Sequence, residues 1–110
     1  MKYFRYMWVG DSLSENRRSI FNKLKKNSLP KDVFVLCLPD EKNRTMDIYP
    51  GNVLQQKYFR ESEQIVVGLA GSQGEAYEMA GAVLGMIYKN YGTTDISAYV
   101  DRVLSVDTET

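Results

Sequence analysis

The sequence contains no histidine and only one cysteine, and both shortages restrict the chemistry open to it. Histidine is the commonest general base and the commonest metal ligand in proteins, so neither role can be filled in the usual way. The single cysteine, Cys37, cannot form a disulfide within the chain, which favours a reducing compartment and a cytoplasmic location. We therefore predict no catalytic residue, no bound metal and no cofactor.

Long hydrophobic runs are also missing. No apolar segment approaches the roughly 20 residues that a membrane span requires. The aromatic segment 1–10 is too short for a signal peptide, is interrupted by Arg5 and is followed by no small-residue cleavage site. We expect no membrane partner. A chain of 110 residues fits one domain, which we place at residues 1–104, followed by a disordered tail at 105–110.

Three short segments are rich in apolar and aromatic residues and predict strands at residues 3–9, 33–38 and 64–69. The second of them has no polar alternation, which is typical of a strand covered on both faces. Tyr49 is expected to be extended because Pro50 follows it. After Gly51 the spacing favours a short helix, with a hairpin as the alternative.

Apolar residues at helical spacing predict two longer helices, at residues 14–27 and 73–91. Ser12 and Ser72 each stand three residues before a glutamate, the spacing of a capping box, and Gly92 is typical of a helix C-terminus. A last short helix is predicted after Thr94.

The resulting order, β-α-β-(short α)-β-α-α, predicts an α/β fold of two or three layers. Alternating strands and helices favour right-handed crossovers and a mostly parallel sheet of three or four strands. A ferredoxin-like α+β arrangement is the alternative.

In a parallel sheet the carboxyl ends of the strands share one edge, where ligands of open α/β sheets bind. The candidate ligand-binding residues are those that follow the three strands: Asp11, Ser12, Asp40, Glu41, Gly71, Ser72 and Gly74. The carboxylates among them could hold Mg²⁺ with a substrate phosphate. However, the glycine-rich turn matches neither phosphate-binding fingerprint, and Glu75 places a negative charge at the start of the helix.

Charge is distributed unevenly along the chain. Residues 1–31 carry eight basic and two acidic residues, a net charge of +6, whereas residues 61–110 carry eight acidic and two basic residues, a net charge of −6. The two ends could neutralise each other in the fold, or a basic face could recruit an acidic protein partner. The basic face of the first helix is formed by Arg17, Arg18, Lys25 and Lys26. The same residues would carry nucleic-acid binding, although a pI near 6.2 is unusual for a dedicated binder.

The helix at 73–91 has more apolar and small surface than one sheet face can bury. Each glycine in a helix interior costs about 1 kcal/mol, so another element is expected to pack there. The predicted interface residues are Met79, Gly81, Ala82, Gly85 and Met86. Either the C-terminal helix or a second copy of the chain would cover them.

These observations favour a non-catalytic binding or regulatory module that acts through protein–protein contact as a homodimer. A small Mg²⁺-dependent enzyme that handles phosphates or nucleotides is the first alternative, and nucleic-acid binding is the second.

Overall fold

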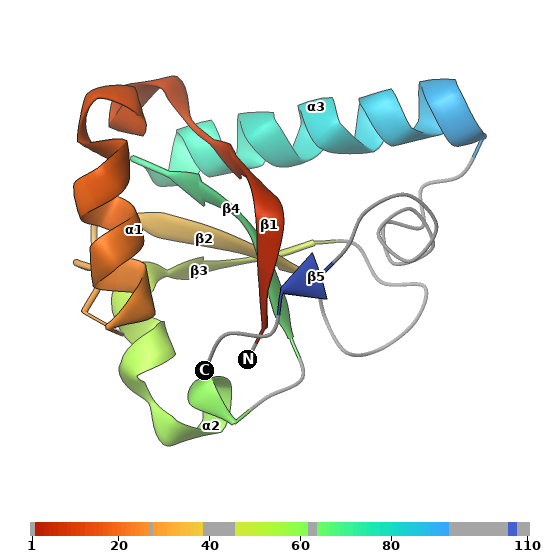
Figure 1. The fold of residues 1–110 in the computed structure, drawn as a ribbon. Helices are drawn as coiled ribbons and strands as arrows, with labels where there is room; N and C mark the ends of the chain where they lie inside the picture. The colour runs from red at the N-terminus through yellow and green to blue at the C-terminus, as the bar shows by residue number, and fades with distance from the viewer. Residues whose placement is uncertain (1, 27, 39–45, 62–63, 93–105, 108–110) are drawn as a thin grey trace.

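The computed structural model describes residues 2–26, 28–38, 46–61, 64–92 and 106–107. A five-stranded sheet in the order β3-β2-β4-β1-β5 organises these residues (Figure 1). The strands are β1 (Lys2–Val9), β2 (Phe34–Leu38), β3 (Asp47–Pro50), β4 (Ile65–Ala70) and β5 (Val106–Asp107). The helical segments are the 3₁₀ turns η1 (Asp11–Asn16) and η2 (Gly51–Gln55) and the α-helices α1 (Arg17–Lys25), α2 (Lys57–Arg60) and α3 (Gln73–Tyr91).

The sheet is mixed. β1 and β4 run parallel, whereas β2 is antiparallel to both β3 and β4, and β5 is antiparallel to β1. The prediction of a mostly parallel sheet is therefore wrong, and the fold is a small α+β arrangement. The ferredoxin-like alternative expects the order β-α-β-β-α-β, from which this chain departs by the helical segments η2 and α2 between β3 and β4 and by its fifth strand.

The direction of β2 follows from the connection that precedes it. After α1 the chain turns at Pro30, whose carbonyl accepts a hydrogen bond from the amide of Val33 (3.2 Å). β2 then begins with Phe34 beside Ala70, the last residue of β4, and ends with Leu38 beside Ile65, the first residue of β4. The carboxyl end of β2 consequently lies at the opposite edge from the carboxyl ends of β1 and β4.

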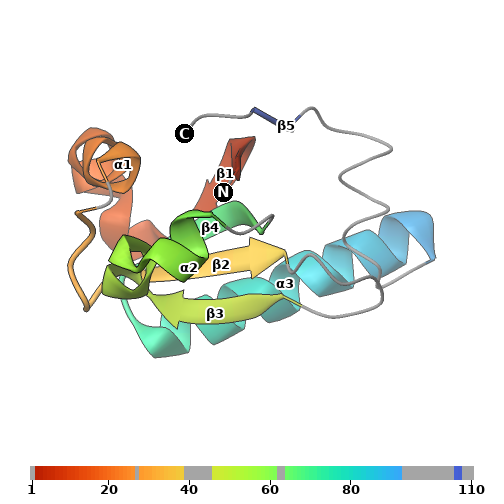
Figure 2. The ribbon, with the colours of Figure 1, turned by 90° about the horizontal axis from the view of Figure 1, so that it is seen from below.

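Helices cover both faces of the sheet (Figures 1 and 2). On one face, α3 packs through Ala76, Val83 and Ile87 against a core that includes Leu36 and Val67. On the other face, η1, α1 and η2 contribute to a second core. Its buried residues are Leu13, Ile20, Leu24, Leu29, Val33, Val35, Cys37, Leu54, Val66 and Leu69. Neighbouring residues of β2 and of β4 contribute to opposite cores, which confirms that β2 is a strand covered on both faces.

The helix predictions differ in accuracy. α3 has the predicted bounds, begins after the capping residue Ser72 and ends at Gly92, which adopts the left-handed conformation (φ 69°). The helix predicted at residues 14–27 is shorter, because residues 11–16 form a 3₁₀ turn and α1 begins only at Arg17.

Within the segment 105–110, Val106 and Asp107 pair with Phe4 and Tyr3 as β5. The helix predicted after Thr94 lies outside the described residues. Among the helices that the structure describes, none combines the length and the hydropathy of a membrane span.

Candidate functional site

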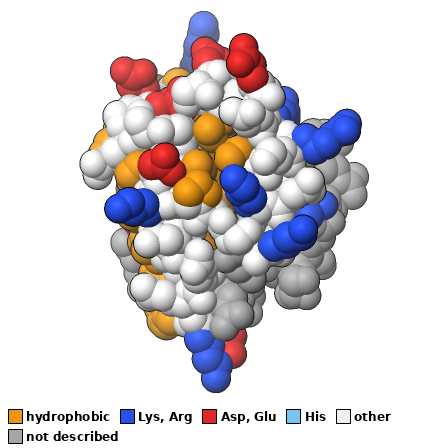
Figure 3. All heavy atoms as spheres, turned by 90° about the vertical axis from the view of Figure 1, so that its left-hand side faces the viewer, with side chains coloured by type: hydrophobic (Ala, Val, Ile, Leu, Met, Phe, Trp, Pro, Cys, Tyr) orange, Lys and Arg blue, Asp and Glu red, His pale blue; other side chains and the backbone are white. Residues whose placement is uncertain are grey.

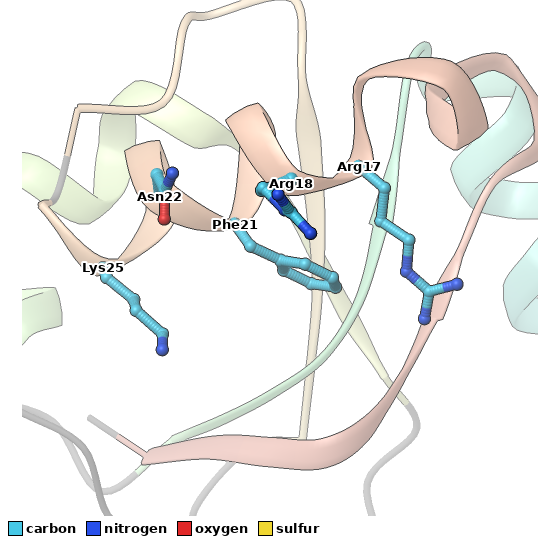
Figure 4. Close-up of a pocket in the computed structure, with 5 residues that line it drawn as sticks. All are labelled: Arg17, Arg18, Phe21, Asn22 and Lys25. Carbon is cyan, nitrogen blue, oxygen red and sulfur yellow. The ribbon is translucent and has the colours of Figure 1, made fainter.

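A groove of about 390 Å³ runs along α1 and is the first candidate site (Figure 4). Arg17, Arg18, Phe21, Asn22 and Lys25 line it. In Figure 4 the side chains of Arg17, Phe21 and Lys25 extend from the helix toward β1. Three of the five lining side chains are cationic and none is acidic, so the groove suits a negatively charged ligand.

The composition of α1 explains this charge. Its inner positions, Ile20 and Leu24, are buried against the sheet, so the polar residues between them are directed outward. Residues 17–26 contain five basic residues and no acidic residue. Figure 3 views this side of the molecule. Basic side chains lie on both sides of a small hydrophobic patch. Acidic side chains lie toward the top of the view, and one lies beside the patch.

Phe21 gives the groove its apolar floor. The sequence places this residue on the buried side of the helix, but in the structure it is only half-buried, and the guanidinium of Arg17 lies 5.5 Å from the centre of its ring. Such a cation–π contact holds the guanidinium in position at little further cost. The combination of a fixed cation and an aromatic surface was missed by sequence reasoning, although the spacing of four residues on a helix was a usable signal.

The second candidate is a pocket of about 190 Å³ where the turns after β1 and β4 meet. Val9, Gly10, Asp11, Glu75, Glu78 and Met79 line it. Of the predicted ligand-binding residues, Ser12 and Gly71 are joined here through Glu75. The Oε1 atom of Glu75 accepts hydrogen bonds from the Ser12 hydroxyl (2.6 Å) and the Gly71 amide (2.7 Å), and its Oε2 atom accepts one from the Ser12 amide (3.3 Å).

These hydrogen bonds define what the turn can do chemically. The amide of Gly71, with the amide and hydroxyl of Ser12, lowers the pKa of Glu75 below its usual value, because each donor favours the ionised carboxylate. Ser72 caps α3 by accepting from the amide of Glu75 (3.1 Å). The donors that could receive a phosphate therefore already bind a carboxylate of the chain itself.

The other predicted ligand-binding residues do not complete this site. Asp11 lines the pocket, and Gly74 is exposed in the first turn of α3, where an added β-carbon would meet no atom within 4 Å. Asp40 and Glu41 lie outside the described residues, and β2, which leads to them, ends at the far edge of the sheet. Among the residues that the structure describes, no three potential metal-binding side chains cluster.

Cys37 lies in the core beneath α1, with 1% of its surface exposed. Burial, together with the nearby charge of Asp47, raises the pKa of its thiol. A thiol in this environment stays protonated at neutral pH and is a poor nucleophile.

The outer side of α3 is the third candidate surface. Of the predicted interface residues, Gly81, Ala82, Gly85 and Met86 are exposed, whereas Met79 packs partly against the core. Tyr77 and Tyr88, which the prediction omitted, are both 61% exposed. Large aromatic side chains at this exposure are typical of contact surfaces.

Comparison with known proteins gives no further guidance to the function of these surfaces. No protein family model, no curated protein and no solved structure matches the chain.

Proposed function

We propose that the protein is a non-catalytic binding module that recognises an acidic segment of a partner protein in the groove along α1. The observation that carries the proposal is the lining of this groove, in which three cations surround a half-buried aromatic ring and none of the five residues is acidic. Arginine suits this role because its planar guanidinium can bind a carboxylate through two hydrogen bonds.

The dimensions of the groove support a peptide ligand. Arg17 and Lys25 are eight positions apart, which corresponds to about 12 Å along a helix. An extended peptide rises about 3.3 Å per residue, so about four residues of a partner would cover the groove. An acidic side chain in such a segment could reach the two arginines at one end of the groove.

A protein ligand fits better than a nucleic acid. Binding of single strands uses exposed aromatic rings on which bases stack, but Phe21 is half-buried and Arg17 already lies over its ring. The overall balance of 14 basic and 14 acidic residues also lacks the excess of positive charge typical of nucleic-acid binders.

The test is fluorescence polarisation with a labelled glutamate-rich peptide and, separately, a labelled oligothymidine. We expect the peptide to bind at low salt and the affinity to fall as salt rises, because the exposed charges become screened over about 10 Å at 0.1 M salt. The double variant Arg17→Glu with Arg18→Glu should bind at least about tenfold more weakly.

Lys23→Glu with Lys31→Glu provides the matched control, since both lysines are exposed and lie outside the lining of the groove and the change in net charge is the same. It changes the net charge without changing the lining and should retain wild-type affinity. If the control and the arginine variants lose the same amount of peptide affinity, the effect depends only on overall charge, and the groove is not the binding site. Tighter binding of oligothymidine than of the peptide would replace this proposal with the nucleic-acid alternative.

A further inference from the structure

α3 presents an exposed stripe of residues that is separate from the α1 groove. Tyr77, Gly81, Gly85 and Tyr88 follow one another at spacings of four, four and three residues, which places them along one side of a helix. Both tyrosines are 61% exposed. A side chain added at Gly81 or Gly85 would meet no atom within 4 Å.

The residues of this stripe do not pack in the core of the protein. α3 packs against the sheet through Ala76, Val83 and Ile87, which are buried on a different side of the helix. Met79 flanks that buried side near the end of β1. Two glycines in the middle of a helix weaken it, and they have no structural partner among the described residues that accounts for their presence.

The two ends of the stripe carry residues that can pair with each other in a second copy of the chain. One border carries Tyr77 near the start of α3 and Tyr88 near its end, and the other carries Glu78 and Lys89, both of which are exposed. The members of each pair are eleven residues apart, and both pairs are centred on the interval between Gly81 and Gly85. Rotation by 180° about an axis through this centre therefore exchanges the ends of the stripe.

We propose that this stripe is the contact surface of a homodimer, in which α3 crosses α3 of a second copy in antiparallel orientation at Gly81 and Gly85. The twofold rotation brings Glu78 next to Lys89 of the second copy and Tyr77 next to Tyr88 of the second copy. Each of these contacts occurs twice, as in any isologous interface. A parallel crossing would instead exchange the two borders, so that Glu78 would lie beside Tyr77 of the second copy and neither charge would meet its opposite.

The glycines explain why the crossing occurs at this point. Packed helices usually lie about 8–10 Å apart, at a distance set by the side chains at the contact. With no side chain at Gly81 or Gly85, the two helices can approach until the tyrosine rings pack beside the crossing. Aromatic pairs of this kind favour stacked or edge-to-face contact.

Sedimentation equilibrium tests the proposal through a charge exchange. The wild-type protein should form dimers at micromolar concentration. Glu78→Lys and Lys89→Glu should each weaken dimerisation at least about tenfold, because each variant faces like charges at both contacts. The double variant E78K/K89E should recover the wild-type dimer, and an equimolar mixture of the two single variants should form the heterodimer.

A second variant tests the crossing point. Gly81→Leu with Gly85→Leu should raise the Tm of the diluted protein, since leucine is a better helix former than glycine, and should abolish the dimer. Lys31→Glu, at an exposed residue outside both α3 and the α1 groove, is the control and should leave dimerisation unchanged. A wild-type monomer at high micromolar concentration, or a dimer that is insensitive to the charge exchange, would overturn the proposal.

Discussion

The carboxylate of Glu75 binds Ser12, which lies 63 residues earlier in the sequence, and so joins the turns that follow β1 and β4. Its three hydrogen bonds to Ser12 and Gly71 fix the end of β1 against the start of α3. Since β1 and β4 are the only parallel pair among the described strands, this carboxylate stabilises the one edge at which two strand ends meet. The residue is thus structural although it lines a pocket.

Replacement of Glu75 by Gln should destabilise the fold by about 1 kcal/mol at pH 7, because the charge that strengthens the three hydrogen bonds is lost. The pKa of Glu75 is lower in the folded chain than its usual value of 4.5. The stabilisation is therefore complete above pH 4.5 and is lost as the pH falls through the folded-state pKa. Urea unfolding of both proteins across this pH range should show their stabilities converging in acid. A constant difference would show that the carboxylate charge contributes nothing.

Gly10→Ala should act through the same carboxylate. Gly10 has φ −63° and ψ 149°, a conformation that alanine adopts without strain, but a β-carbon there would overlap the carboxyl group of Glu75. We expect a loss of about 1–2 kcal/mol in the wild type and almost none in the Glu75→Ala background. The double-mutant cycle from four urea titrations measures the coupling, and additive losses would contradict it.

Sequence reasoning succeeded at the residue scale where both partners lie on one element. The spacing of Ser72 and Glu75 predicts a capping box, and Ser72 does cap α3. The equivalent spacing at Ser12 and Glu15 predicts a second box that does not form, because the 3₁₀ turn already begins at Asp11 with Gly10 at its N-cap. The Ser12 hydroxyl donates to Glu75. A contact between distant turns cannot be inferred from local spacing.

At the scale of helices and strands, too, the sequence predicts what depends on neighbouring residues and misses what depends on distant contacts. α3 could be predicted to the residue because its cap, its apolar positions and its terminal glycine all lie within the segment. β5 could not, because Val106 and Asp107 form a strand only through pairing with β1. Two residues carry no periodicity that distinguishes them from a loose tail.

Removal of residues 106–110 should therefore destabilise the protein even though the segment contains only two paired residues. Loss of β5 exposes the outer edge of β1, and an unpaired edge promotes association with other strands. We expect a loss of about 1–2 kcal/mol in urea unfolding, at about 1 kcal/mol for each hydrogen bond, and faster aggregation in light scattering. Removal of residues 108–110 alone is the control and should preserve the stability.

At the scale of the whole molecule, the direction of β2 explains why the predicted enzyme site does not assemble. β2 runs antiparallel to β4, so its carboxyl end lies at the opposite edge of the sheet. The apolar run Phe34–Leu38 is correctly predicted as a doubly covered strand, but its side chains are equally well buried in either direction. Direction depends on the turn near Pro30, which leads the chain to the edge where β4 ends. Of the three predicted turns, those after β1 and β4 therefore meet. Their hydrogen-bond donors, on Ser12 and Gly71, already bind the carboxylate of Glu75.

The placement of α1 and α3 on opposite faces of the sheet has a consequence for binding strength. A pair of copies joined through α3 keeps both α1 grooves on its outer sides, so that two sites are carried on one rigid particle. A ligand with repeated acidic segments would engage the second site at a raised effective concentration once the first is filled. Weak individual contacts would then yield tight, selective retention of multivalent partners.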